Sequence, residues 1–465
     1  MAQNGLMVSV SGIRGRVGES LTPEVVAAYA AAFGAWALRK GQPQRPIVVG
    51  RDSRVSGPMF HRAAIAALQS VGANVIDIGL TTTPTCQLAV ETHHAAGGIM
   101  LSASHNPIEW NALKLIGPSG LFLEAREGAE MRALLEKGIP RATWDRLGSV
   151  ETDGGAAQRH LERVLEIPYV DVAAIRARGF HVALDCVHGA GAVIVPALLE
   201  RLGCKVTAIH TEADGRFPRP PEPVAENLGE LEQLVRDSRA DIGFAVDPDV
   251  DRLVLVSEQG KTIGEDYTLA LAAMLVLRHR TGPAVTNMST SLVVQEAVTR
   301  GGSTLTLAPV GEVNVAVRMR EMHAVIGGEG NGGVILPEVH LGRDAPVGIA
   351  LILQLLTEEK RPLSSLVSSL PRYSIVKDKL DRPNASLDSV YAALRSAFGD
   401  ANVDTQDGLR LAWNDRWLHV RPSGTEPIVR VIAEAPTSDE ARKLVGQARV
   451  LLERLGAPAV AGVSR

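Results

Sequence analysis

Three aspartates alternate along the segment Asp247-Pro-Asp-Val-Asp-Arg252, directly after an apolar run. In an extended loop, residues two apart point the same way, so the carboxylates of Asp247, Asp249 and Asp251 would converge. Converging anions repel one another unless a cation lies among them, and hard oxygen ligands suit Mg²⁺. A calcium-binding EF-hand loop would begin similarly, but Arg252 stands where that loop requires glycine, and the following residues read as a strand. The spacing therefore predicts a magnesium site, with a solvated acidic turn as the alternative.

A serine on a stiff loop is the candidate nucleophile. Ser104 lies in Ser102-Ala-Ser-His-Asn-Pro107, after a small, apolar stretch that reads as a buried strand, and Pro107 restricts the loop. A serine hydroxyl is a weak nucleophile unless a base or a metal activates it. Because sequence neighbours rarely face each other, we expect His105 to orient the loop or assist proton transfer rather than form a triad with Ser104. On these residues alone, a polar turn is the more ordinary interpretation.

Three cationic segments could bind phosphate groups. Ser11-Gly-Ile-Arg-Gly-Arg-Val-Gly18 interleaves glycines with arginines, although a flexible terminus would look the same. Lys114, which follows the serine loop, could offset charge or move a proton if its pKa is depressed; a surface lysine is the alternative. Arg421-Pro-Ser-Gly-Thr-Glu-Pro427 lies between apolar strands and offers an arginine, hydroxyls and backbone donors, with Arg430 just beyond. A hairpin connection is the alternative for this last segment.

The segment Gly327-Gly-Glu-Gly-Asn-Gly-Gly333 is rich in glycine but lacks the Gly-Lys-Ser/Thr ending of a Walker loop. It is therefore not expected to hold a nucleoside triphosphate. One carboxylate and one amide among glycines suit sugar hydroxyls, because the backbone can approach a ligand closely.

The elements that must position these groups include a unit that recurs three times: strand, polar loop, helix, glycine and strand. The copies occupy 47–78, 181–209 and 284–307, and each has the pattern of a βαβ unit. Three such units predict three α/β domains of similar build. Together with breaks in the pattern between them, they divide the chain into domains at 1–154, 155–255, 256–370 and 371–465.

Composition narrows the function classes. The 465 residues are 45% hydrophobic and 22% charged, with a net charge of −4, so no basic field points to nucleic acid or to an acidic membrane surface. Three widely spaced cysteines fit a reducing compartment. No signal peptide and no apolar run of about 18 residues is evident, so a cytoplasmic location without a membrane span is expected. Composition leaves a monomer and a homodimer equally open.

Taken together, these segments resemble the α-D-phosphohexomutase superfamily. Ser-Ala-Ser-His-Asn-Pro is similar to the family's phosphoserine loop, and the segments that begin at Asp247, Gly328 and Arg421 are similar to its metal, sugar and phosphate loops. They occur in family order and span most of the chain. The resemblance implies three related α/β domains with mixed sheets between helices, a smaller C-terminal α+β domain, and an active site in the central cleft.

The resemblance also implies a role for each loop. Ser104 is expected to be a phosphoserine and, with Asp247, Asp249 and Asp251, to bind one Mg²⁺ per active site. The expected catalytic residues are Ser104, His105, Lys114, Arg14 and Arg252. The residues expected to bind the sugar and its non-reacting phosphate are Glu329, Asn331, Gly332, Arg421, Ser423, Gly424, Thr425 and Arg430.

The activity implied is interconversion of 6-phospho and 1-phospho hexoses through a bisphosphorylated sugar, which also acts as activator. The family commonly has Gly-Gly-Glu-x-Ser-Gly-His in its sugar loop, whereas Asn331 replaces the serine here and Gly333 the histidine. This variant resembles an archaeal-type, phosphoglucosamine mutase-like branch, so glucosamine phosphate is the expected substrate, and the general base is unassigned. Glucose or mannose phosphate is the alternative substrate. A metal-assisted sugar phosphatase and a non-catalytic sugar-phosphate sensor are the alternative functions.

Overall fold

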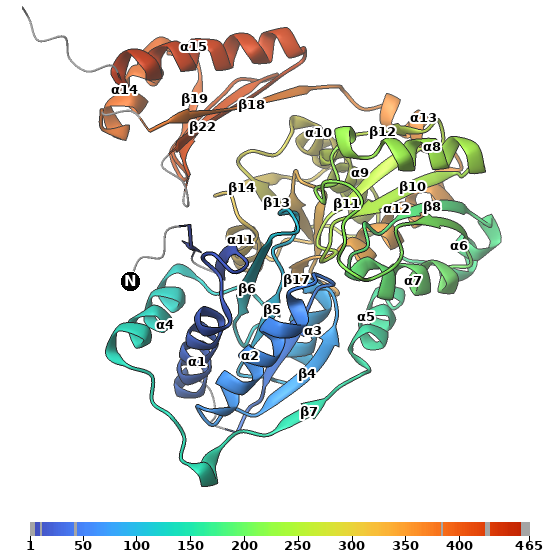
Figure 1. The fold of residues 1–465 in the computed structure, drawn as a ribbon. Coiled ribbons are helices and arrows are strands. Elements are labelled where there is room, and N and C mark those ends of the chain that lie inside the picture. The colour runs from blue at the N-terminus through green and yellow to red at the C-terminus, as the bar shows by residue number, and fades with distance from the viewer. Residues whose placement is uncertain (1–4, 10–11, 41–43, 383–384, 424–427, 457–465) are drawn as a thin grey trace, which may run out of the picture.

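The computed structural model describes residues 5–9, 12–40, 44–382, 385–423 and 428–456. Within these residues the chain forms four sheets that follow one another along the sequence (Figure 1). The first three are mixed and the fourth is antiparallel. The predicted fold class, three α/β domains followed by a different C-terminal domain, is confirmed. No helix in the described part of the chain is both long enough and apolar enough to span a membrane.

The first sheet has the strand order β1-β2-β6-β5-β3-β4-β7. Its predicted βαβ unit is β3-α2-β4, with parallel strands, and β5 leads into the serine loop. The strands are β1 (Met7–Val8), β2 (Gly12–Arg16), β3 (Ile47–Arg51), β4 (Val75–Leu80), β5 (Gly97–Leu101), β6 (Trp110–Ile116) and β7 (Val150–Thr152). The helices are α1 (Pro23–Lys40), α2 (Gly57–Gln69), α3 (Thr83–Thr92), α4 (Ala125–Lys137) and the short 3₁₀ turn η1 (Trp144–Arg146).

The glycine–arginine segment near the N-terminus contributes a strand to this sheet. Its residues Gly12–Arg16 form β2, which pairs antiparallel with β6, so this part of the chain is not a flexible terminus. Glycine has a low strand propensity, but a Cβ at Gly12 would lie 2.6 Å from the carbonyl oxygen of Leu113, so the close pairing requires glycine there. The pairing sets Arg14 opposite Ala112, within the same sheet as the serine loop.

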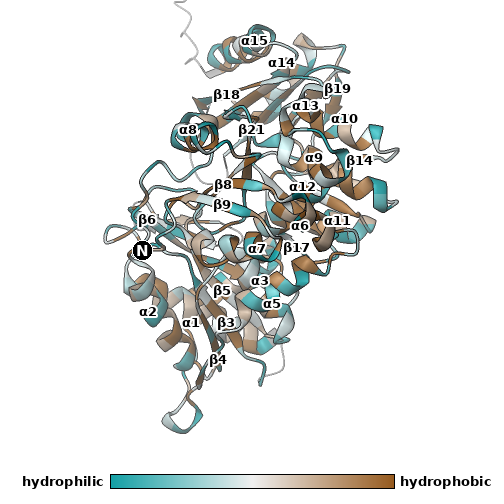
Figure 2. Cartoon of the chain, turned by 90° about the vertical axis from the view of Figure 1, so that its right-hand side faces the viewer, coloured by the Kyte–Doolittle hydropathy of each residue, from teal (hydrophilic) through white to brown (hydrophobic). Residues whose placement is uncertain are grey.

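The second and third sheets share one apolar core. Helices α9 (Asp266–His279) and α12 (Ala345–Glu359) are buried almost throughout and pack with both sheets, and they carry many of the brown, hydrophobic residues in Figure 2. The second sheet, in the order β12-β11-β10-β8-β9, comprises β8 (His181–Asp185), β9 (Lys205–Ile209), β10 (Ile242–Val246), β11 (Leu253–Ser257) and β12 (Lys261–Thr262). The helical segments here are α5 (Ala156–Leu165), α6 (Val172–Arg178), η2 (Ala190–Val193), α7 (Val195–Arg201), η3 (Ala225–Asn227) and α8 (Gly229–Ser238).

The third sheet, in the order β14-β13-β15-β16-β17, comprises β13 (Ala284–Asn287), β14 (Leu305–Ala308), β15 (Ile326–Glu329), β16 (Gly333–Leu336) and β17 (His340–Arg343). Its helices are α9 (Asp266–His279), α10 (Leu292–Arg300), α11 (Glu312–Met322), α12 (Ala345–Glu359) and α13 (Leu363–Ser368). The other two βαβ units are β8-α7-β9 and β13-α10-β14, each with parallel strands. The division expected between 255 and 256 falls inside β11, which pairs with β10 and β12, so the pairing favours a division after β12.

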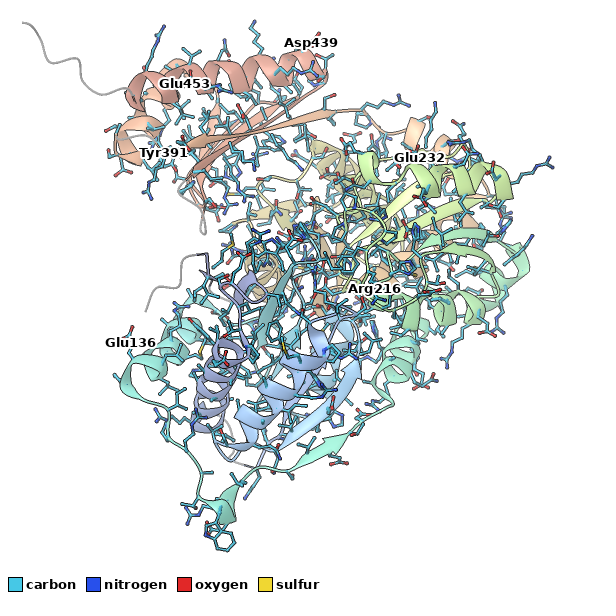
Figure 3. The ribbon with its side chains drawn as sticks, in the orientation of Figure 1. Glu136, Arg216, Glu232, Tyr391, Asp439 and Glu453 are labelled. Atoms are coloured by element: carbon cyan, nitrogen blue, oxygen red, sulfur yellow. The ribbon has the colours of Figure 1, made fainter. Side chains whose placement is uncertain are left out.

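The C-terminal domain is one antiparallel sheet with the order β18-β22-β21-β20-β19 and two helices on it. Figure 3 shows Asp439 and Glu453 on the outer helix α15, and Tyr391 on α14. The elements are β18 (Ser374–Asp381), α14 (Leu387–Ala397), β19 (Asn402–Asp404), β20 (Leu409–Ala412), β21 (Trp417–Pro422), β22 (Ile428–Ala435) and α15 (Ser438–Gly456).

The C-terminal domain docks on the N-terminal end of α10 in the third domain. Glu434 accepts hydrogen bonds from the backbone N–H of Leu292 at 2.8 Å and from the indole of Trp417 at 2.7 Å. Asp266 lies beside this contact, and its carboxylate accepts the backbone N–H of Ser291 at 2.9 Å. Carboxylates at the N-terminal end of a helix satisfy N–H groups that have no partner within the helix.

Asp266 should make stability depend on pH. Burial raises its pKa from the ordinary 3.8 to about 8. Between these values the unfolded chain releases the proton and the folded protein keeps it, so stability falls as the pH rises through this window. Asp266→Asn keeps the hydrogen-bond acceptor and has no proton to lose. We expect its unfolding midpoint at pH 8.5 to lie a few degrees above that of the unmodified protein, and the two to converge toward pH 4; an equal offset at every pH would contradict this.

Candidate active site

Ser104 lies just past the end of β5 in a strained backbone conformation. Its φ of 48° is in the left-handed region, which residues other than glycine seldom adopt and which is typical of functional loops. The backbone N–H of Ser104 donates to the hydroxyl of Ser102 at 2.9 Å, and that hydroxyl donates to Asp52 at 2.6 Å. The hydroxyl of Ser104 donates to Oδ2 of Asp247 at 2.7 Å. The loop thus presents the serine to the aspartate cluster.

Arg54, for which sequence analysis predicted no role, binds the backbone of this loop. Its side chain is fully buried, its Nε contacts Asp52 at 3.2 Å, and its two terminal nitrogens donate to four backbone carbonyls at 2.6–2.9 Å. The carbonyls belong to Ser104, Asn106, Pro107 and Trp110. A single guanidinium therefore fixes the path of the chain from the serine to β6.

Replacing Arg54 with methionine should destabilise the protein strongly. The change would leave the buried Asp52 without its cation and four carbonyls without their donor, and breaking a buried pair costs about 3–5 kcal/mol. Urea unfolding of Arg54→Met should show a loss of that size. Arg62→Met, at an exposed position of α2, is the matched control and should change stability by less than about 0.5 kcal/mol. Equal losses in the two variants would contradict the role of Arg54.

The three aspartates converge as predicted, but by a turn rather than by an extended loop. Val250 has a φ of 68°, and Oδ1 of Asp247 accepts the backbone N–H groups of Asp251 and Arg252 at 3.1 and 3.2 Å. All three side chains are buried, and one oxygen from each lies within 4.8 Å of the others. Among the described residues, Oδ1 of Asp249 and Oδ1 of Asp251 have no hydrogen-bond partner. Buried carboxylate oxygens of this kind fit the ligand set of Mg²⁺.

The electrostatics of this cluster are dominated by burial and by Lys114. Burial and the two neighbouring carboxylates raise the pKa of Asp247. Burial also acts to raise the pKa of Asp249, but Lys114, whose Nζ lies 2.5 Å from Oδ2 of Asp249, outweighs it and the pKa is lowered. Conversely, burial acts to lower the pKa of Lys114, but Asp249 and Asp251 outweigh it and raise that pKa. In this arrangement the two carboxylates therefore favour the charged form of Lys114.

His105 faces Ser104 more directly than expected. Because the backbone turns at Ser104, the ring Nδ1 of His105 lies 3.4 Å from the serine hydroxyl. On the other side of the ring, Nε2 lies 3.9 Å from Oε1 of Glu222. Burial, with the nearby charges of Arg252 and Arg14, lowers the pKa of His105 to about 2, so the ring is neutral. A neutral imidazole beside the hydroxyl can exchange a proton with it.

Two predicted arginines lie beside the serine loop. Arg14 donates from Nη1 to the side-chain oxygen of Asn106 at 2.7 Å. Arg252 donates from Nη1 to Glu222 at 3.1 Å. Both line the same cavity as Ser104, so both can face an anionic group that approaches the serine.

The sugar loop presents Glu329 at the end of β15. Its Oε1 accepts from the amide of Asn287 at 2.8 Å and from the backbone N–H of Gly311 at 3.1 Å. Its Oε2 accepts from Arg343 at 2.9 Å and lies 3.4 Å from the amide of Asn331. Asn287 and Arg343 were not predicted. Asn287 is the last residue of β13, the first strand of a βαβ unit, and this position is the one signal that could have identified it.

The phosphate segment brings its two predicted arginines together. Arg421 on β21 and Arg430 on β22 are paired across the fourth sheet. Nε of Arg421 is also 2.9 Å from Oδ2 of Asp407. The backbone N–H of Ser423 donates to the backbone carbonyl of Ile428 at 2.9 Å. Two predicted residues of this segment, Gly424 and Thr425, lie outside the described residues.

A cavity of about 550 Å³ joins these groups across all four domains. Glu222 and Glu312, neither of them predicted, also line it, and the fully buried aspartates lie behind its serine. The predicted residues that line it are Arg14, Ser104, His105, Lys114, Arg252, Glu329, Asn331, Arg421 and Arg430. A cavity with a hydroxyl at the aspartate cluster and two arginines on a different domain suits a small molecule with two anionic groups.

Comparison with known proteins gives the family. Four family models described as phosphoglucomutase/phosphomannomutase match in order: alpha/beta/alpha domains I, II and III at 6–141, 158–260 and 264–373, and the C-terminal domain at 376–449. A probable phosphoglucosamine mutase of Methanopyrus kandleri is 38% identical, over 95% of this chain and 96% of its own. A phosphoglucomutase/phosphomannomutase of Thermococcus kodakarensis is 37% identical, over 97% and 99%. The crystal structure of a phosphoglucomutase/phosphomannomutase family protein from Burkholderia thailandensis superposes with a TM-score of 0.85, at 26% identity and 97% coverage of both chains. The chain is therefore a member of the phosphoglucomutase/phosphomannomutase family.

Proposed function

We propose that this protein is a phosphohexomutase, which moves a phosphoryl group between the 6- and 1-positions of a hexose through a phosphorylated Ser104. The observation that carries the proposal is the placement of Ser104. Its hydroxyl contacts the aspartate cluster at 2.7 Å, and it opens into a cavity that Arg421 and Arg430 of the fourth domain also line. One end of a bisphosphorylated sugar can thus react while the other end is held.

The proposed role of each group of site residues follows from its position in the cavity. Asp247, Asp249 and Asp251, with Ser104, would hold Mg²⁺, which when bound would neutralise charge on the transferring phosphoryl group. Arg14 and Arg252 face the same group from the first and second domains, and phosphoryl transfer depends chiefly on such positioning and electrostatic stabilisation. Glu329 and Asn331 would bind sugar hydroxyls while the intermediate turns over.

The chemistry requires transfer in two directions. Phosphorylated Ser104 gives its phosphoryl group to the free hydroxyl of a 6-phosphosugar or 1-phosphosugar. A bond forms between phosphorus and the sugar oxygen, the serine P–O bond breaks, and the proton lost by the sugar hydroxyl is balanced by one gained at the serine oxygen, which leaves a bisphosphorylated hexose. That hexose reorients, the Arg421 segment binds the phosphate just added, and the other phosphate returns to Ser104. The remote arginines supply binding energy that the reacting end can use.

We propose glucosamine phosphate as the preferred substrate. The support is the Asn331–Gly333 variant of the sugar loop, together with relatives named probable phosphoglucosamine mutase. Another relative is named phosphoglucomutase/phosphomannomutase, so glucose and mannose phosphates are the competing candidates. The proposal includes one Mg²⁺ per site, activation by a hexose 1,6-bisphosphate and a cytoplasmic location.

The test compares kcat/KM for glucosamine, glucose and mannose 1-phosphates, with and without the matching 1,6-bisphosphate. We expect the glucosamine ester to be preferred and the bisphosphate to increase the rate. A higher kcat/KM for glucose or mannose phosphate would overturn the substrate assignment and leave the mutase assignment intact. Steady release of inorganic phosphate would indicate a phosphatase, and binding without turnover a sensor.

A further inference from the structure

Arg343, the last residue of β17, contacts three carboxylates that belong to different segments of the chain, one of them at the start of α11. It donates from Nη2 to Asp251 at 2.8 Å, from Nη1 to Glu329 at 2.9 Å and from Nε to Glu312 at 3.0 Å. The side chain is 9% exposed and lines the central cavity. Asp251 belongs to the aspartate turn of the second domain, and Glu329 to the sugar loop of the third. One guanidinium therefore connects the two loops directly.

The geometry of this contact demands arginine. A guanidinium is planar and its N–H groups point in fixed directions, so three carboxylates bound to one fork are fixed relative to one another. The ammonium group of lysine would supply the same charge at a single point, so it would not fix the three carboxylates relative to one another. Arginine stays protonated in proteins, so Arg343 can position and neutralise these carboxylates but takes up no proton from the reaction.

Gly333 leaves the space that the side chain of Arg343 occupies. A Cβ built at Gly333 would lie 2.2 Å from Cδ and 2.9 Å from Cγ of Arg343, and the next nearest atom is Oδ1 of Asn331 at 3.2 Å. The φ of Gly333 is outside the left-handed region, so the backbone itself does not require glycine. Gly333 also pairs with Glu329 across β15 and β16. The absence of a side chain at 333 is thus explained by Arg343.

We infer that Arg343 is a positioning residue that orients Glu329 toward the sugar and fixes it relative to Asp251. The contact requires glycine at position 333, because any side chain there would occupy the space of Arg343. The inference rests on the proposed function, which assigns Glu329 to the sugar and Asp251 to the cation. It predicts that residue 333 affects sugar binding through Arg343 and not through the backbone of the sugar loop.

A double-mutant cycle on binding tests the inference. Gly333→Ala, Arg343→Ala and the double variant are made in a full-length Ser104→Ala background, so that glucosamine 6-phosphate binds without turnover. Calorimetry at fixed MgCl₂ then gives the dissociation constant of each. We expect Gly333→Ala to weaken binding about tenfold when Arg343 is present and less than about twofold when it is alanine, since residues in contact couple and independent ones add. A tenfold loss in both backgrounds would overturn the inference.

Arg343→Lys provides a second test that does not need the alanine variant to fold. This variant keeps the positive charge but loses the planar guanidinium, so we expect it to bind glucosamine 6-phosphate about tenfold more weakly than the Ser104→Ala parent. Binding within twofold of that parent would overturn the inference. Arg300→Lys, at an exposed arginine of α10, is the matched control and should bind like the parent. If the Ser104→Ala parent binds no hexose phosphate at all, the proposed function fails instead, which separates the two failures.

Discussion

Ser104→Ala is expected to lose at least about 10⁴-fold in kcat, because the variant has no oxygen to carry the phosphoryl group. Incubation with a hexose 1,6-bisphosphate labelled in its phosphates should place one label per chain on the unmodified protein and none on the variant. The removed hydroxyl also contacts Asp247, but the fold should tolerate the change, since Ser104 keeps its backbone contacts with Ser102 and Arg54. Circular dichroism and the unfolding midpoint check this.

Ser102→Ala is the matched control for this experiment. Its hydroxyl supports the loop by bonding to Asp52 and to the backbone of Ser104, so its loss should reduce the rate but still allow labelling of Ser104. Turnover by Ser104→Ala above about 1% of normal, or label on another residue of that variant, would contradict the assignment of Ser104 as the phosphoryl carrier.

The sequence could reveal this serine because the signal is contiguous. The serine loop, the aspartate turn, the sugar loop and the phosphate segment are each a few residues of unusual composition after a strand. The βαβ units were equally visible, since a glycine ends each helix before the next strand. Local chemistry of this kind can be interpreted without knowing which segments meet.

The site residues that sequence analysis did not predict are brought to the site by tertiary packing. Arg54 lies 50 residues before Ser104 and reaches its loop because β3 and β5 are adjacent strands. Arg343 meets Asp251 across 92 residues, where the second and third domains join. An isolated arginine in a sequence carries no sign of which carboxylates or carbonyls it will meet. Its role becomes visible when the sheet order is known.

Backbone conformation accounts for the other differences. Alternating aspartates suggested an extended loop, but the left-handed φ of Val250 makes a turn that brings the same carboxylates together. A similar turn at Ser104 brings His105 toward the hydroxyl, which an extended chain would not do. Positive φ at residues other than glycine has weak sequence signals, so both turns lay beyond sequence reasoning.

Removal of divalent cations should abolish activity. Among the described residues, one buried oxygen each of Asp249 and Asp251 lacks a hydrogen-bond partner, and burial together with the neighbouring carboxylates raises the pKa of Asp247. A cation would complete such a cluster. Dialysis against EDTA should leave less than about 1% of the rate, and MgCl₂ should restore it. Activity that survives exhaustive chelation would contradict the metal assignment.

A readout independent of turnover is the effect of MgCl₂ on thermal unfolding. A ligand present at 100 times its dissociation constant stabilises a protein by about 2.7 kcal/mol, so the midpoint of the unmodified protein should rise with added MgCl₂. Asp249→Asn should abolish that rise, because the amide replaces a charged ligand, and it should lower kcat by roughly 10²-fold or more. Asp237→Asn, at an exposed position of α8, is the matched control and should preserve both the rise and the rate. An equal rise in all three proteins would place Mg²⁺ elsewhere, because a site at the aspartate turn must lose affinity when Asp249 loses its charge.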